Sequence, residues 1–170
     1  ATGRVAVTTF ASHVERITSA VKAARSAGRE VVIAGRAMRN TIEAARKCGM
    51  LKDAGAFLDE DAFGYLPNNK IMLLCTGSQG EPRAAIARIG EDQHPHVALE
   101  KGDLVIFSSR TIPGNEKDVS LVHNNLAKLD VDVITADEAL VHTSGHPRQD
   151  ELKTMYEWLN PKAVVPMHGE

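Results

Sequence analysis

"KIMLLCTGSQGEPRAAIARI", residues 70–89, is the stretch of sequence that best predicts the fold of this chain. Its apolar run, Ile71 to Cys75, is typical of a strand that is buried on both faces, and the residues after Gly80 have apolar side chains at helical spacing. Pro82 is expected near the first turn of that helix, where a missing N–H costs little. A glycine-containing loop therefore joins a buried strand to a helix.

The same alternation of strand and helix continues along the rest of the chain. Alternating units with continuously apolar strands predict an α/β fold, with a mainly parallel sheet and helices on both faces, as in Rossmann-like domains. One helix is expected to begin with a cap at Ser12 and to end at Gly28. The further strands are expected at residues 4–7, 30–35, 103–109, 130–135 and 163–167, and the further helices at 37–47, 116–129 and 148–159.

Composition limits the class of protein. With 170 residues, 43% hydrophobic and 25% charged, the chain fits one soluble globular domain. A net charge of -2 shows no basic excess, so a nucleic acid would have to bind at a local site. Cys48 and Cys75 lie outside any CxxC pattern, and no apolar run resembles a membrane span or a signal peptide. We therefore expect a cytoplasmic protein with no membrane contact.

Glycine and hydroxyl residues follow several of the predicted strands. In a parallel sheet these loops lie at the carboxyl edge, where ligands bind. Glycine permits close backbone approach and hydroxyls donate hydrogen bonds, so the edge is expected to form a phosphate-binding surface. One such loop alone is more often an ordinary turn, but several together favour a site. Residues 76–83 are not a Walker A loop, because GxxxxGK[ST] is absent.

The segment "HTSGH" contains His142 and His146, four positions apart. Such a pair on a helix could bind zinc. However, Ser144 and Gly145 are poor residues for a helix interior, and Pro147 disfavours the helical conformation at His146. A loop that leads into the next helix is the better prediction, with His146 facing a bound anion and His142 in a supporting role.

His168 is a candidate metal ligand, since it follows the last predicted strand and precedes a glycine. One ligand does not make a site, because catalytic zinc usually has three protein ligands. The sequence contains no HxHxDH cluster that would supply the others.

Four segments together resemble a known family: "TTFASHVERI", "LLCTGSQGEPRAAIARI", "GDLVIFSSRTIPGNEKDVS" and "HTSGHPRQDELKTMYEWLNPKAVVPMHGE". Their ordered combination is similar to the β-CASP region of ribonuclease J, a member of the metallo-β-lactamase superfamily. The resemblance spans essentially the whole chain. It implies that residues 1–170 are a single β-CASP domain and a fragment of a longer enzyme, in which this domain is inserted into a metallo-β-lactamase domain.

The resemblance also implies an activity and a set of site residues. The family cleaves single-stranded RNA over two zinc ions, both internally and from the 5′ end, and prefers a 5′ monophosphate. By position, His146 matches a catalytic histidine at the scissile phosphate and His168 matches a zinc ligand. The pocket around the RNA phosphate would contain Gly77, Ser78, Ser144 and Gly145, with His142 at its edge.

The fragment alone is expected to be inactive, because most of the family's metal ligands lie upstream of it and two-metal hydrolysis needs them. The alternative from another class is a stand-alone nucleotide- or phosphate-binding module without catalysis. The strand-end loops suit that alternative, but the GxGxxG fingerprint is absent and aromatic residues for base stacking are few. An HxHxDH cluster upstream of Ala1 would decide for the enzyme.

Overall fold

Five strands form one sheet in the computed structural model, which describes residues 1–166. All neighbouring strands are parallel, in the order β2-β3-β1-β4-β5, which confirms the predicted α/β class. The strands are β1 (Val5–Thr8), β2 (Glu30–Ile33), β3 (Ile71–Cys75), β4 (Leu104–Phe107) and β5 (Asp132–Ile134).

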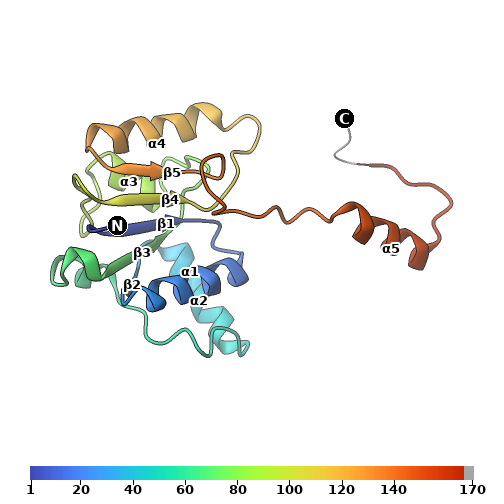
Figure 1. The fold of residues 1–170 in the computed structure, drawn as a ribbon, viewed down its shortest axis with the longest axis horizontal. Helices are drawn as coiled ribbons and strands as arrows, with labels where there is room; N and C mark the ends of the chain where they lie inside the picture. The colour runs from blue at the N-terminus through green and yellow to red at the C-terminus, as the bar shows by residue number, and fades with distance from the viewer. Residues whose placement is uncertain (167–170) are drawn as a thin grey trace.

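Helices cover both faces of this sheet (Figure 1). On one face lie α1 (Val14–Ser26) and α2 (Arg36–Lys47), and on the other lie α3 (Ala85–Gly90) and α4 (Glu116–Lys128). Two short 3-10 helices, η1 (Glu60–Gly64) and η2 (Asn68–Lys70), precede β3. A further helix, α5 (Gln149–Leu159), lies apart from the sheet at the end of an extended segment (Figure 1).

The alternation of side chains along each strand divides the core in two. Val7 and Met72 point to the side of α1 and α2, where they pack in a cluster with Ile17. Leu73 and Val105 point to the side of α3 and α4, in a second cluster. Because both faces bury apolar side chains, the strands read as continuous apolar runs, and this is why the sequence pattern identified them.

Two helix starts differ from the prediction. His13, and not Ser12, caps α1, because its Nδ1 accepts a hydrogen bond from the Arg16 backbone N–H at 3.2 Å. A neutral imidazole nitrogen is an acceptor and can replace the usual hydroxyl there. The helix after the glycine loop begins only at Ala85, so Pro82 lies in the preceding turn.

The predicted strand at 163–167 is also wrong where it can be compared. Residues 163–166 form no strand and are exposed, and residue 167 lies outside the described part of the chain. An apolar pattern alone does not make a strand, because the backbone also needs a partner for its ladder. Within residues 1–166, no helix has the length and apolar character needed to cross a membrane.

Candidate functional site

The carboxyl ends of β1, β3 and β4 bring buried polar side chains together. Buried polar groups normally have hydrogen-bond partners, so their bonds reveal how the loops are joined. The polar residues buried at or just after these strand ends are Thr8, Thr9, Ser78, Gln79, Ser108 and Ser109.

The loop after β4 is the centre of this cluster. Ser109 Oγ donates to the Ser78 carbonyl at 3.4 Å, and Thr9 Oγ1 donates to the Ser108 carbonyl at 3.3 Å. Ser108 Oγ donates to the Val141 carbonyl at 2.6 Å. Hydrogen bonds therefore connect three strand-end loops with the segment that leads to His142, as expected for loops at one edge of a parallel sheet.

Arg16 on α1 strengthens the same connection, although no pattern in the sequence indicated this role. Its Nη1 donates to the Ser108 carbonyl at 3.0 Å and its Nη2 donates to the Thr143 carbonyl at 2.8 Å. Partial burial lowers the pKa of this guanidinium. An arginine one turn into a helix looks like an ordinary surface residue in a sequence, and only the fold shows which carbonyls it reaches.

Gln79 holds the glycine loop of residues 76–80 against the loop after β4. Its side chain donates from Nε2 to the Arg110 carbonyl at 2.9 Å. Its Oε1 accepts from the Ile112 N–H at 2.8 Å and from Asn115 Nδ2 at 3.3 Å. Both ends of the Gln79 amide are hydrogen-bonded, so this side chain fixes the glycine loop to the loop after β4. This role was not predicted from the sequence.

The glycines of this loop are required by close packing. A Cβ on Gly77 would lie 2.6 Å from the Cβ of Ala84, and one on Gly80 would lie 2.4 Å from the carbonyl carbon of Asp118. The N–H of Gly80 donates to the Gly77 carbonyl at 2.9 Å, inside the loop. This N–H group is therefore not directed at a ligand in the structure.

Ser78 lines a cavity of about 410 Å³ at the ends of β4 and β5, although only 2% of the residue is exposed. Ser109, Arg110 and His123 also line it. The imidazole of His123 packs edge-on against Phe107 at 4.4 Å between ring centroids. Its Nε2 is buried without a hydrogen-bond partner, and burial lowers its pKa.

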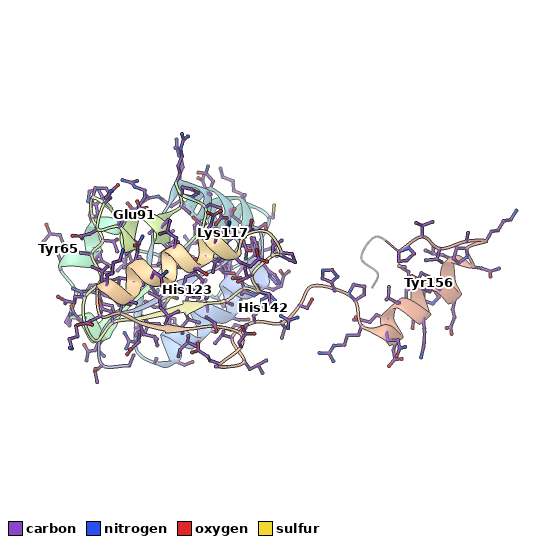
Figure 2. The ribbon with its side chains drawn as sticks, turned by 90° about the horizontal axis from the view of Figure 1, so that it is seen from above. Tyr65, Glu91, Lys117, His123, His142 and Tyr156 are labelled. Atoms are coloured by element: carbon purple, nitrogen blue, oxygen red, sulfur yellow. The ribbon has the colours of Figure 1, made fainter. Side chains whose placement is uncertain are left out.

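His142 lies at the edge of the sheet domain, where the extended segment toward α5 begins (Figure 2). Its Nδ1 is buried without a hydrogen-bond partner. Burial is the main cause that lowers the pKa of His142, and the nearby charges of Arg16 and Arg110 lower it further. His142 as a whole is half-buried, and its supporting role stays a prediction.

The other predicted site residues lie farther along the extended segment. Ser144, Gly145 and His146 are exposed, and Ser144 Oγ accepts a hydrogen bond from the His146 backbone N–H at 3.1 Å. The segment is not helical, as Gly145 and Pro147 predicted. Gly77, Ser78 and His142 therefore lie at or beside the buried polar cluster. Ser144, Gly145 and His146 lie outside it.

A metal site is not formed by the described residues. Among residues 1–166, no three His, Cys, Asp or Glu side chains are grouped so that they could hold an ion. Catalytic zinc usually has three protein ligands, so this part of the chain does not fit such a centre by itself. The predicted ligand His168 lies outside the described residues.

Matches to known proteins cover the whole chain. Residues 2–126 match the family model of the ribonuclease J β-CASP domain, and residues 130–170 match that of the RNA specificity domain of Zn-dependent metallo-hydrolases. The chain is 51% identical to a ribonuclease J from Sinorhizobium meliloti over 170 residues, 42% identical to one from Mycolicibacterium smegmatis and 41% identical to one from Thermus thermophilus. These alignments cover 99 to 100% of this chain but only 30% of each relative.

Proposed function

The chain belongs to the ribonuclease J family, and from this membership we propose that it is the RNA-handling β-CASP part of a zinc-dependent ribonuclease. The full-length enzyme would act in the cytoplasm on single-stranded RNA, cutting it internally and also from a 5′ end, with a preference for a 5′ monophosphate. The chain spans about 30% of the length of these relatives, so this activity is proposed for the longer protein.

The observation that supports this proposal best is the hydrogen-bonded connection at the carboxyl edge of the sheet. The loops of Thr9, Ser78 and Ser108 are joined to the segment that carries His142 and His146. This is the edge at which open parallel sheets bind ligands. Gly77, Ser78, His142, Ser144 and Gly145 are proposed to surround an RNA phosphate at this edge.

We assign two different roles to the last two histidines. His146 is exposed, as a residue that must reach RNA should be, and is proposed to contact or protonate the scissile phosphate. His168 is proposed as one zinc ligand. The remaining ligands and the two zinc ions would belong to the rest of the full-length enzyme, where the ions would supply activation of water and stabilisation of charge.

Residues 1–170 are proposed to act as one β-CASP unit within that enzyme. The two family models meet between residues 126 and 130, just ahead of β5. Because β5 pairs with β4, this boundary crosses a single sheet.

The exposed apolar side chains of α5 support the proposal that α5 packs against another part of the same polypeptide. None of its residues is buried, and it exposes Met155, Trp158 and Leu159. An exposed apolar cluster of this kind usually marks a contact surface. We propose that it packs against the metallo-β-lactamase domain of the full-length chain.

The first experiment measures zinc content and RNA cleavage of the 170-residue chain. We expect little bound zinc and no cleavage of a 5′-monophosphorylated single-stranded RNA, because the described residues do not form a metal site. Tight stoichiometric zinc together with cleavage would refute the proposal. If the full-length reading frame lacks an HxHxDH cluster and the chain binds a nucleoside monophosphate, the stand-alone binding module is correct instead.

The second experiment uses the full-length enzyme with His146→Ala. Loss of a proton-transferring group should lower kcat by about 10² to 10⁴, while zinc content stays unchanged. His96→Ala is the matched control, since the side chain of His96 is exposed in a loop outside the proposed site and its loss should not change kcat. Loss of zinc in His146→Ala would show that this residue is a metal ligand.

A further inference from the structure

One half of one sheet face is left without a helix. On β4, Val105 and Phe107 point toward α4 and are buried, whereas Leu104 and Ile106 point to the opposite face and are only half-buried. On that opposite face α1 and α2 pack on the side of β2, β3 and β1 (Figure 1). Parallel sheets are normally covered on both faces, so another element is expected to pack on the uncovered half.

A groove of about 1080 Å³ occupies this uncovered half, between α1 and β4. Its floor contains the apolar side chains of Val5, Leu104 and Ile106. Its wall on α1 contains Ala20 and Ala23, whose small side chains leave room for a neighbouring element.

The groove runs along the whole length of the strands. At the amino ends of the strands it is lined by Ala1 and Thr2, and at the carboxyl ends by Val141, His142 and Thr143. A four-residue strand rises about 13 Å, a distance that a helix covers in about nine residues. The groove therefore has the length of two to three turns of helix.

We propose that this groove is filled by a helix of the same polypeptide that immediately precedes Ala1 in the full-length protein and runs antiparallel to β1. Arg29 fixes the start of the described chain at one end of the groove, because its Nη2 donates to the Ala1 carbonyl at 2.8 Å and its Nη1 donates to the Gly3 carbonyl at 2.9 Å. A helix that ends there can turn directly into β1, as in other units of alternating helix and strand.

The other occupants are less favoured by the structure. The helix α5 lies well away from α1 and β4, which border the groove (Figure 1), and is joined to the groove's far end through Thr143. The relatives are long enough to supply another helix, since this chain spans only 30% of their length. This inference concerns how the sheet is covered, and it does not depend on RNA cleavage.

Photo-crosslinking in the full-length protein identifies the occupant. A benzoylphenylalanine replaces Ala23, which lines the groove and is exposed in the described chain. We expect crosslinks within one molecule to the segment that immediately precedes Ala1. Crosslinks to a more distant upstream segment, to α5, to residues after Glu170 or to a second molecule would overturn the proposal. Ala44, which is exposed on α2 outside the groove, is the matched control and should not give the same product.

A smaller probe tests coverage of the groove without a bulky side chain. In a Cys48→Ser background, which removes the exposed thiol of these 170 residues, maleimide labelling of the peptides that carry Ala23→Cys and Ala44→Cys is followed by mass spectrometry. In the full-length protein we expect Ala23→Cys to react at least about tenfold more slowly than Ala44→Cys, because labelling requires local opening. Equal rates would mean that the groove is uncovered. In the 170-residue chain the two positions should react alike.

Discussion

Arg16 links the loop after β4 to the segment with the catalytic candidate. It contributes two charge-assisted hydrogen bonds, one to the Ser108 carbonyl and one to the Thr143 carbonyl. A lysine could not make both bonds in this geometry, because only a guanidinium has a planar fork of donors. The position of His146, three residues beyond Thr143, therefore depends on a residue of α1.

Replacing this arginine is expected to affect stability and catalysis together. Arg16→Ala should lower the free energy of unfolding of the 170-residue chain by about 1 to 3 kcal/mol, since hydrogen bonds of a charged donor are lost. Urea denaturation followed by circular dichroism measures the change. In the full-length enzyme kcat should fall while zinc content stays the same.

Lys22→Ala is the control for Arg16→Ala, because Lys22 is an exposed charged residue on the same helix. It should change the free energy of unfolding by less than about 0.5 kcal/mol. If both variants behave alike, the two bonds of Arg16 contribute little to stability.

At this scale the sequence could predict residue types but not partners. It indicated that the glycine and hydroxyl residues after several strands would lie at one sheet edge, because strand ends in a parallel sheet share that edge. It could not indicate that Gln79 braces two loops or that His13 caps α1, since these roles depend on distances set by the folded backbone.

Among the elements, the glycine loop after β3 has the strictest steric requirement. Gly80 has φ +77°, and its missing Cβ leaves space for the backbone of Asp118 and Val119 at the start of α4. The loop and the helix therefore pack backbone against backbone. A side chain at this position would push α4 away from the sheet edge or strain the turn.

Gly80→Ala is expected to lower the free energy of unfolding by roughly 2 to 4 kcal/mol, because strain at positive φ adds to a clash with backbone atoms. Gly102→Ala is the matched control, since Gly102 has φ +90° and an added Cβ would meet no atom within 4 Å, so this change should cost about 1 to 2 kcal/mol. Urea midpoints compare the two. Equal losses of unfolding free energy would mean that the loop accommodates the added Cβ without displacing α4.

The elements show where sequence patterns succeed and where they fail. Strands such as Ile71–Cys75 were predicted because burial on both faces leaves a continuous apolar run. The expected strand at 163–167 has a similar apolar run, but residues 163–166 have no ladder partner in the described part of the chain. The pattern reports the hydrophobicity of a segment, whereas a strand also requires a neighbour.

For the whole molecule, the lowered pKa values of three partly buried histidines determine the expected dependence of stability on pH. Burial is the main cause that lowers the pKa of His94, His123 and His142 from the usual 6.5. The folded protein therefore keeps them neutral, while the unfolded chain binds protons at pH 6.5. Their contribution to stability is complete above pH 6.5 and is lost as the pH falls below it, toward the folded pKa values.

We therefore expect the melting temperature to change little between about pH 8 and 7 and to fall from about pH 6.5 to 5. Circular dichroism melts across this range measure it. His123→Phe, which keeps an aromatic ring against Phe107, should make the fall shallower. Tyr65→Phe is the control at an exposed position that carries no imidazole, and it should leave the slope unchanged. A flat profile for the unaltered chain would contradict the burial of these imidazoles.

The separation of α5 from the sheet has a consequence for spectroscopy. The chain has one tryptophan, Trp158, which lies on α5 with 82% of its surface exposed. Its emission reports the surroundings of α5 and carries no direct signal from the sheet. A fluorescence titration of this chain with denaturant would therefore show little change at the point where the sheet unfolds, and the same indole becomes a specific reporter once a partner covers α5.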